Sequence, residues 1–155
     1  MPDLLVKLYE LPEIRPKLAK GIIVRPVMAA EISMMRDWIE ERFSRGWADE
    51  FECSAHHSPV GSLIAIEERT PLGFACYDTT ALGLFGPTGV DRSQRGKGIG
   101  GALLFAALDA MKTKGHAYAI IGWAGPIDYY EKLVGASVIE GSEARYTKTL
   151  ITEPE

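Results

Sequence analysis

Apolar residues recur along this chain in two different periods, which predict a mixture of strands and helices. Short runs rich in β-branched and aromatic residues, bounded by glycine or proline, predict strands over residues 4–9, 21–27, 62–66, 72–77, 82–90, 118–123, 137–139 and 145–150. Between the second and third strands, apolar side chains recur at helical spacing with charged residues elsewhere. This spacing predicts an amphipathic helix from Ile32 to Phe43 that ends at Gly46.

The most strongly predicted helix covers residues 98–114. Its apolar face would carry Ile99, Leu103, Ala106 and Ala110, and Gly115 follows as a C-cap. A shorter helix would begin at Pro126 and end at Gly135. Residues 47–60 mix aromatic, acidic and histidine side chains and predict either a short helix or an irregular loop.

The order of these elements indicates an α/β (α+β) fold with a mixed, largely antiparallel sheet flanked by helices. One β-α-β crossover is expected around residues 98–114, because the strand 118–123 is a continuous apolar run, typical of burial on both faces. The strand 82–90 is interrupted by Gly83, Gly86 and Gly89. So much glycine predicts a bulged strand whose backbone approaches a ligand closely.

The length of 155 residues suits a single domain, which we expect over residues 21–150. Residues 1–20 would form an N-terminal arm, and residues 151–155 a frayed tail. Three interpretations of the arm stay open: an extra edge strand, a contact in a homodimer, or a terminal strand packed on the domain.

Composition and charge exclude several classes of protein. The net charge of −4 argues against nucleic acid as a partner. Cys53 and Cys76 are far apart and form no C-x-x-C pair, which argues against a disulfide framework and a zinc site. The first residues lack the apolar region of a signal peptide, and no window is long and apolar enough for a membrane span. We therefore expect a cytoplasmic protein without a membrane partner.

The segment 90–104 carries the most specific chemistry. Glycines stand at positions 96, 98, 100 and 101, between an apolar run and a run of strong helix formers, with Arg92, Arg95 and Lys97 interleaved. Such a loop exposes backbone N–H groups ahead of the positive end of a helix. A nest of amides beside cationic side chains predicts a phosphate or pyrophosphate site.

Two common phosphate motifs do not fit this loop. A dinucleotide fingerprint at 96–101 needs a strand that ends at the first glycine and an acidic residue about 20 residues later, and neither is present. A Walker loop needs glycine where Asp91 stands and serine or threonine where Gly98 stands. The pattern R-x-x-G-x-G, formed by Arg95, Gly98 and Gly100, remains.

That pattern resembles the signature of the GNAT superfamily of acyl-CoA-dependent N-acyltransferases. The stretch V-D-R-S-Q-R-G-K-G-I-G-G-A-L-L from Val90 is similar to the longer family string and differs in having Arg92 for its proline. The resemblance implies the GNAT fold over about residues 22–150, acetyl-CoA as acyl donor and no metal. The implied cofactor-binding residues are Val90, Gln94, Arg95, Gly96, Lys97, Gly98, Ile99, Gly100 and Gly101.

Transfer of an acyl group from a thioester to an amine makes three chemical demands. The amine must be neutral, the developing oxyanion needs hydrogen-bond donors, and the departing thiolate benefits from a proton. The resemblance implies that a backbone N–H near Val90 serves the oxyanion. It also implies that Tyr130 is the general acid, because residues 126–136 are similar to the family's tyrosine segment.

The tyrosine segment departs from the family pattern in two ways. Trp123-Ala124-Gly125 stands where the family has an asparagine, and the spacing from Tyr130 to Gly135 carries one extra residue. Tyr130 could instead pack on the inner face of its helix, with Tyr129 as the alternative acid.

No general base stands at the family's usual position, since the strand residues 83–86 contain no glutamate. Asp78 and Glu50 are the candidates, and Glu52 or ordered water is a further alternative. Asp49, Glu50, Glu52, Asp78 and Asp128 could form an acidic mouth for a cationic amine or could be solvated surface. Trp47 and Trp123 could stack on a sugar or aromatic ring.

The sequence therefore predicts a cytoplasmic N-acetyltransferase that moves the acetyl group of acetyl-CoA directly to a primary amine. The acceptor would be a small molecule (an amino sugar, an amino acid or a polyamine) or a peptide. Because the strand glutamate is missing, a catalytically silent CoA-binding sensor or assembly subunit is the alternative. A domain that prefers NAD or ATP is the remaining hypothesis. The C-x-x-H-H segment from Cys53 is not expected to bind metal, because adjacent histidines do not readily face one ion.

Overall fold

The computed structural model describes residues 1–143, 149–152 and 154. The described chain contains a seven-stranded sheet with the strand order β2-β3-β4-β5-β6-β1-β7. The strands are β1 Leu4–Lys7, β2 Ile22–Pro26, β3 Ser62–Glu67, β4 Thr70–Tyr77, β5 Leu84–Val90, β6 Tyr118–Ile121 and β7 Ser137–Val138. The α-helices are α1 Ile32–Arg42, α2 Arg45–Ala55, α3 Ile99–Lys114 and α4 Ile127–Val134. Short 3₁₀ turns cover Leu8–Glu10, Ala29–Glu31 and Arg92–Gln94.

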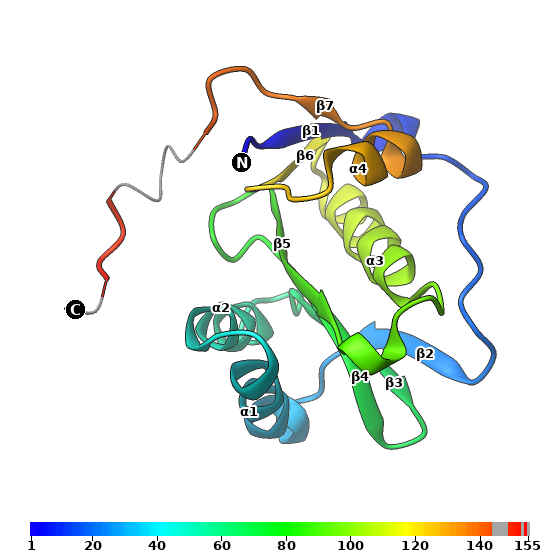
Figure 1. Cartoon of the computed structure of the whole chain (residues 1–155), viewed down its shortest axis with the longest axis vertical. Helices are drawn as coiled ribbons and strands as arrows, with labels where there is room; N and C mark the ends of the chain where they lie inside the picture. Colours follow the sequence, from blue (N-terminus) through cyan, green and yellow to red (C-terminus); the bar gives the residue numbers. More distant parts are fainter. Residues whose placement is uncertain (144–148, 153, 155) are drawn as a thin grey trace.

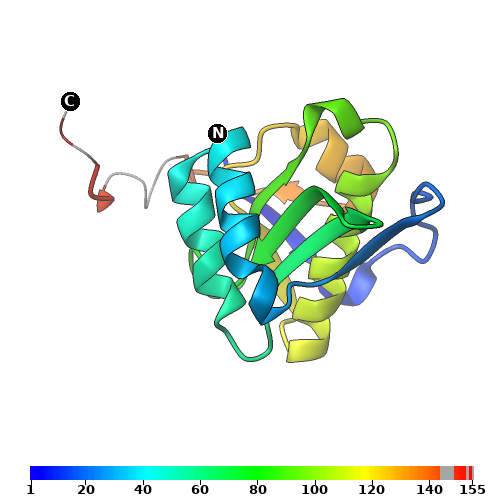
Figure 2. The ribbon, with the colours of Figure 1, turned by 90° about the horizontal axis from the view of Figure 1, so that it is seen from below.

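The helices cover both faces of the sheet. Helices α1 and α2 lie against one face, and α3 and α4 lie on the other (Figures 1 and 2). Each face has its own apolar cluster. Met35, Ile39 and Phe51 pack on Phe74 on the first face, whereas the longer α3 packs on the opposite face. The central strand β4 is therefore buried on both sides, which its continuous apolar sequence requires.

The one parallel pair among the described strands, β5 and β6, is joined by α3. The pair is short: Leu84 faces Ile120 and Phe85 faces Ile121. Beyond Phe85, strand β5 follows β4 as far as the pairing of Gly73 with Val90, and the β4–β5 register shifts between Ala75 and Tyr77. The irregular strand predicted from its glycines is thus observed. Because β5 stays with β4 and leaves β6, the sheet opens beside the N-terminus of α3.

Two predictions about elements need correction. Gly46 does not end a helix. Helix α1 ends at Arg42, and α2 begins at once because the Ser44 hydroxyl accepts a hydrogen bond from the Trp47 N–H at 3.2 Å. Residues 47–55 therefore belong to helix α2, so the first part of the segment 47–60 is helical. The strand in residues 1–20 is not at the edge of the sheet, because β1 lies between β6 and β7. The strand expected over 145–150 begins outside the described residues.

Candidate functional site

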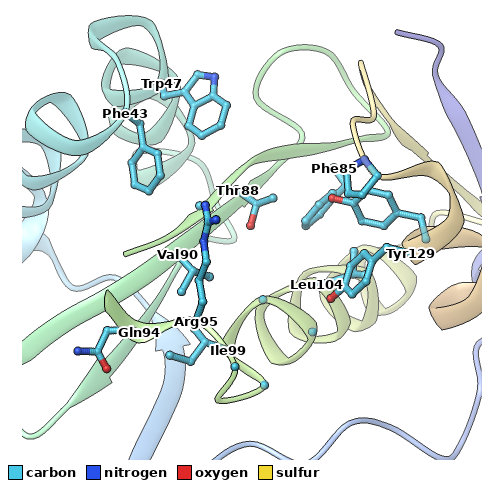
Figure 3. Close-up of a pocket in the computed structure, with 17 residues that line it drawn as sticks. Phe43, Trp47, Phe85, Thr88, Val90, Gln94, Arg95, Ile99, Leu104 and Tyr129 are labelled. Atoms are coloured by element: carbon cyan, nitrogen blue, oxygen red, sulfur yellow. The ribbon is translucent and has the colours of Figure 1, made fainter. Parts of the chain in front are cut away.

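A pocket of about 790 Å³ opens where β5 leaves β6 (Figure 3). Its walls come from four parts of the chain: the α1–α2 junction, strand β5, the glycine loop with the start of α3, and helix α4. The lining residues are Phe43, Trp47, Phe85, Thr88, Gly89, Val90, Gln94, Arg95, Gly96, Gly98, Ile99, Gly100, Gly101, Leu104, Pro126, Tyr129 and Tyr130. The pocket therefore connects the glycine loop to the opening between the strands.

The glycine loop presents backbone N–H groups that the described protein leaves without acceptors. Gly96 and Gly98 have φ values of +84° and +77°, which favour glycine, and Gly98 is the N-cap of α3 with no side-chain cap. Hydrogen bonds within this part of the described chain begin with the Ala102 N–H, which donates to the Gly98 carbonyl at 3.0 Å. The N–H groups of residues 96–101 are thus free for an anion, next to the positive end of a 16-residue helix.

Side chains of the loop add positive charge to the pocket. Arg95 extends from the loop across the pocket mouth toward Phe43 (Figure 3), and it is the sole charged side chain among the described lining residues. Lys97 donates to the Gln94 side-chain oxygen at 2.6 Å, which holds its ammonium beside the loop. Amides and cations together suit a pyrophosphate.

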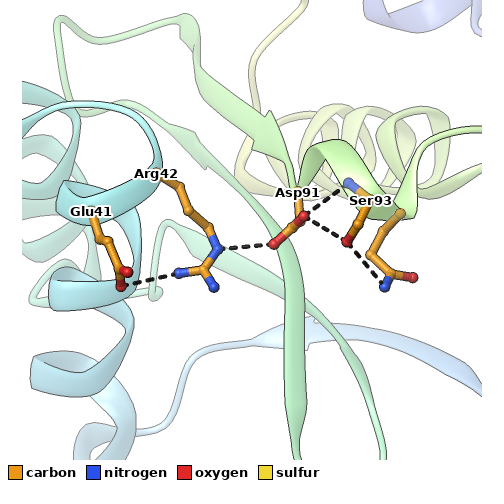
Figure 4. Close-up of polar contacts among 5 residues, drawn as sticks. Glu41, Arg42, Asp91 and Ser93 are labelled. Atoms are coloured by element: carbon orange, nitrogen blue, oxygen red, sulfur yellow. Dashed lines mark hydrogen bonds and ion pairs between the residues drawn. The ribbon is translucent and has the colours of Figure 1, made fainter.

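A smaller cavity of about 420 Å³ continues from the pocket past Phe43 and Val90. Arg42 at the end of α1 lies at 2.9 Å from the Asp91 carboxylate at the end of β5, and Asp91 also accepts from Ser93 (Figure 4). The hydrogen bond from Arg42, followed by those from Ser93, lowers the pKa of Asp91 to about 2. The ionised Asp91 therefore ties α1 to the start of the glycine loop.

Two adjacent tyrosines of α4 line the far end of the pocket. Tyr130 is 8% exposed, and burial raises its pKa to about 12. Its hydroxyl has no hydrogen-bond partner within the described residues. Burial also raises the pKa of Tyr129, whose hydroxyl lies over the first turn of α3, 3.6 Å from the position of a Cβ at Gly101. A buried phenol that stays protonated can donate a proton to a leaving group.

Asp78 does not line the pocket. Its buried carboxylate accepts from Lys114 at 2.8 Å, from His116 at 2.9 Å and from the Gly83 N–H at 2.6 Å. Burial alone would raise the pKa of Asp78, but these hydrogen bonds outweigh it and hold the pKa below its ordinary value. Asp78 thus joins the β4–β5 loop to the end of α3, away from the glycine loop.

The other acids expected at the mouth are also held elsewhere. Burial raises the pKa of Glu50, and a hydrogen bond from the Thr80 hydroxyl to its carboxylate partly offsets this effect. Asp49 and Glu52 lie at 2.7 and 3.0 Å from the Arg36 guanidinium. Neither these acids nor Asp128 are among the described residues that line the pocket, so the acidic mouth stays a prediction.

The pocket has an aromatic wall, which the sequence predicted only in part. Trp47 lines the pocket as expected for a stacking residue, whereas Trp123 does not. Phe43, interpreted from its spacing as a core residue, stacks on Trp47 with centroids 5.4 Å apart and planes inclined by 27°. A Cβ at Gly89 would lie 2.6 Å from the Phe43 ring, so glycine at this β5 position makes room for the ring.

Metal ligands and thiols add no further chemistry to this pocket. Among the described residues, no group of three or more His, Cys, Asp or Glu side chains could hold a metal ion. Burial raises the pKa of the Cys76 thiol to about 12, which makes it a poor nucleophile. In the described part of the chain, no helix has the length and apolar character needed to cross a membrane.

Several solved structures have a similar fold. A GCN5-related N-acetyltransferase from Sphaerobacter thermophilus has a TM-score of 0.70 at 20% identity, covering 89% of this chain and 48% of that one. A region of a fungal multi-domain GH3 β-N-acetylglucosaminidase, described as a GCN5-related glucosamine N-acetyltransferase, has a TM-score of 0.69 at 13% identity, covering 89% of this chain and 19% of that one. This chain thus spans less than half the length of either protein.

A GNAT acetyltransferase from Brucella melitensis, solved in complex with acetyl-CoA, has a TM-score of 0.56 at 20% identity, over 76% of this chain and 86% of that one. No curated protein sequence matches this chain. The family model for acetyltransferases of the GNAT family matches residues 29–136, which is most of the domain and includes the glycine loop, α3 and α4. The chain therefore belongs to the GNAT acetyltransferase family.

Proposed function

We propose that this protein is an N-acetyltransferase that moves the acetyl group of acetyl-CoA directly to a primary amine within a ternary complex. The observation that carries the proposal is the row of N–H groups at residues 96–101, which have no acceptor among the described residues and face a pocket that reaches Tyr130. The loop amides and Arg95 would bind the pyrophosphate of the donor. The apolar channel past Ile99 and Leu104 would take the pantetheine arm.

The chemical step follows from the residues around the thioester. The amine nitrogen attacks the thioester carbonyl carbon, a C–N bond forms and the C–S bond breaks. Tyr130 gives its phenolic proton to the departing thiolate, and a backbone N–H near Val90 stabilises the oxyanion. Because neither Asp78 nor Glu50 lines the pocket, water takes the proton from the nitrogen, and solvent returns a proton to the Tyr130 phenolate.

A small-molecule amine is the acceptor that we favour. The fungal region with a similar fold is described as acting on glucosamine, which supports an amino sugar as the first acceptor to test. A cytoplasmic location fits the free state of both cysteines, Cys53 and Cys76.

The absence of a carboxylate from the described pocket favours one second candidate, a CoA-binding sensor without turnover. A single experiment separates the two. The purified chain is titrated with acetyl-CoA by calorimetry, and free thiol is then followed with a panel of amines. Binding with amine-dependent thiol release supports the enzyme, and binding without release on any amine supports the sensor. Absence of binding refutes both.

A further inference from the structure

The pocket wall opposite the glycine loop differs in chemistry from the loop itself. Within the described residues this wall contains no carboxylate and no imidazole. The wall therefore offers an ammonium ion no counter-charge. It also offers no side chain that could remove a proton from one.

This composition restricts the basicity of the acceptor. An alkylamine with a pKa of about 10.4 is neutral in only about one molecule in 2500 at pH 7, whereas an amine with a pKa near 8 is neutral in about one in ten. An enzyme with a side-chain base in contact with the amine can compensate for the first case. A pocket that depends on water therefore favours amines with a larger neutral fraction at pH 7.

The shape of the wall restricts the body that carries the amine. Phe43 and Trp47 form an aromatic shelf, which we define by these two stacked rings. Phe74 contacts both rings edge-on, at centroid distances of 5.6 and 6.1 Å, and Phe51 supports Phe74 from behind. These contacts support the shelf from the protein side. Trp47 is 37% exposed, so the shelf is accessible to a ligand. A flat, supported ring face binds another flat face by stacking.

We infer, on the basis of the proposed function, that the acceptor is a weakly basic primary amine borne on a ring that stacks on the exposed Trp47 of this shelf. Amino sugars and aromatic amines share this chemistry. Flexible polyamines and lysine side chains do not, since they are strongly basic and have no ring.

The test compares acceptors and variants in the full chain. The values of kcat/KM are measured for a hexosamine, an arylamine and a linear diamine. We expect either ring amine to exceed the diamine, with the rate following the neutral fraction of the amine as pH changes. Trp47→Ala should raise the KM of the ring amine about tenfold and leave the KM of acetyl-CoA unchanged, because one stacking contact is lost. Trp47→Phe should restore most of the loss, and Trp123→Ala, outside the pocket, is the matched control.

The outcomes separate this inference from the function on which it rests. If acetyl-CoA does not bind to the wild type, the proposed function fails. If it binds and is turned over but the diamine is the best acceptor, or Trp47→Ala affects every amine equally, the acceptor class is wrong and the function stands. A preference for the hexosamine or for the arylamine decides which of the two ring chemistries applies.

The N-terminal arm carries a second, independent inference. Residues 15–19 lie outside the matched family region and pack on the outer side of the glycine loop. The Ala19 N–H donates to the Lys97 carbonyl at 3.0 Å. The Lys17 carbonyl oxygen lies 2.3 Å from where a Cβ of Gly98 would be, so the arm, rather than a ligand, fills the space that glycine leaves.

This contact fixes the direction of one amide of the loop. In a planar trans peptide, the carbonyl of Lys97 and the N–H of Gly98 point in opposite directions. Because Ala19 holds the carbonyl on the arm side, the Gly98 N–H is directed to the other side, toward the pocket that Gly98 lines. The arm thereby orients a group of the anion site without touching the anion.

The arm is itself anchored on α3. The Arg15 guanidinium donates to both carboxylate oxygens of Asp109, at 2.5 and 2.9 Å. The Cζ atom of Arg15 lies 4.4 Å from the centre of the Phe105 ring. Pro16 lies 3.4 Å from the position of a Cβ at Gly101. The geometry points to Arg15 and Asp109 as positioning residues for the donor site.

The test compares the effect of each substitution on CoA affinity with its effect on turnover. Arg15→Ala and Asp109→Ala should each raise the Kd of CoA and the KM of acetyl-CoA about fivefold, because one of several loop amides loses its orientation, with kcat and the KM of the amine unchanged. Glu13→Ala, an exposed arm residue, is the control. Variants that bind CoA as tightly as the wild type, with or without a lower melting temperature, would overturn the positioning role. A wild type that does not bind CoA refutes the proposed function instead.

Discussion

At the scale of single residues, environment decides what each titratable group does. Tyr130 and Asp78 are both buried, at 8% and 3% exposure, yet they differ in what surrounds them. Tyr130 lines the pocket, and its hydroxyl has no hydrogen-bond partner in the described part of the chain, whereas the Asp78 carboxylate accepts from Lys114, His116 and Gly83. Only the first arrangement leaves a group available for proton transfer.

Removal of the Tyr130 hydroxyl tests its role as general acid. Tyr130→Phe should lower kcat about 100-fold with little effect on the KM of acetyl-CoA, because proton donation in the transition state is lost. Since the pKa of Tyr130 is about 12, the wild-type kcat should not decline from tyrosine ionisation below about pH 11. Tyr129→Phe is the matched control, and steady-state kinetics on both variants provide the measurement. A kcat that falls in Tyr129→Phe and not in Tyr130→Phe would transfer the role to Tyr129.

Substitution of Asp78 should affect stability rather than catalysis. Asp78→Asn should reduce the free energy of unfolding by about 2 kcal/mol, because Lys114 loses its counter-ion and His116 loses a carboxylate partner. The folded pKa of Asp78 lies below its ordinary value of 3.8. The stabilisation is therefore fully present above about pH 4 and is lost as pH falls through the folded pKa. Urea unfolding of both proteins between pH 2 and 7 measures this, and a loss of kcat at unchanged stability would restore Asp78 as a base.

At the scale of elements, local signals predicted some boundaries and not others. The left-handed Gly98 and Gly115 bound α3, and Gly135 ends α4, because these positions need no distant partner. The break between α1 and α2 was misplaced, since Gly46 looked like a stop whereas Ser44 provides an N-cap. Strand β1 lies between β6 and β7 because it pairs with residues more than 100 positions away in the sequence. A local sequence pattern cannot predict such pairing.

The same reasoning applies to the candidate site. The glycine loop could be predicted because its conformation depends on residues that are adjacent in the sequence. The base candidates could not, because Asp78 meets Lys114 36 residues later and Arg36 meets Asp49 and Glu52 from another helix. The sequence shows where the carboxylates stand, but it does not show which distant basic side chain pairs with each of them.

The capping residue at the helix junction offers a test at the element scale. Ser44→Ala should lower the free energy of unfolding by about 1 kcal/mol, because the Trp47 N–H loses its acceptor at the start of α2. Ser44→Asp should keep most of the stability, since a carboxylate caps equally well and suits the helix dipole. Chemical denaturation measures both. Equal stability of Ser44→Ala and the wild type would show that packing alone starts α2.

At the scale of the whole molecule, the sheet, the N-terminal arm and the helices together build the pocket beside the glycine loop. Strand β5 leaves β6 and opens the pocket, α3 directs its positive end at the opening, and the arm supports the loop from the outer side. The aromatic shelf and the tyrosines of α4 close the remaining sides. A donor held at one end and an acceptor held at the other would meet beside Tyr130.

The central claim is that the amides of residues 96–101 bind the diphosphate of CoA. Titration of ¹⁵N-labelled protein with CoA, followed by amide chemical shifts, tests it most directly. We expect the largest shifts at Gly96, Gly98, Gly100 and Gly101, with inorganic pyrophosphate shifting the same amides at higher concentration. Shifts that leave these glycines unchanged while CoA saturates another surface, or no binding at all, would contradict it.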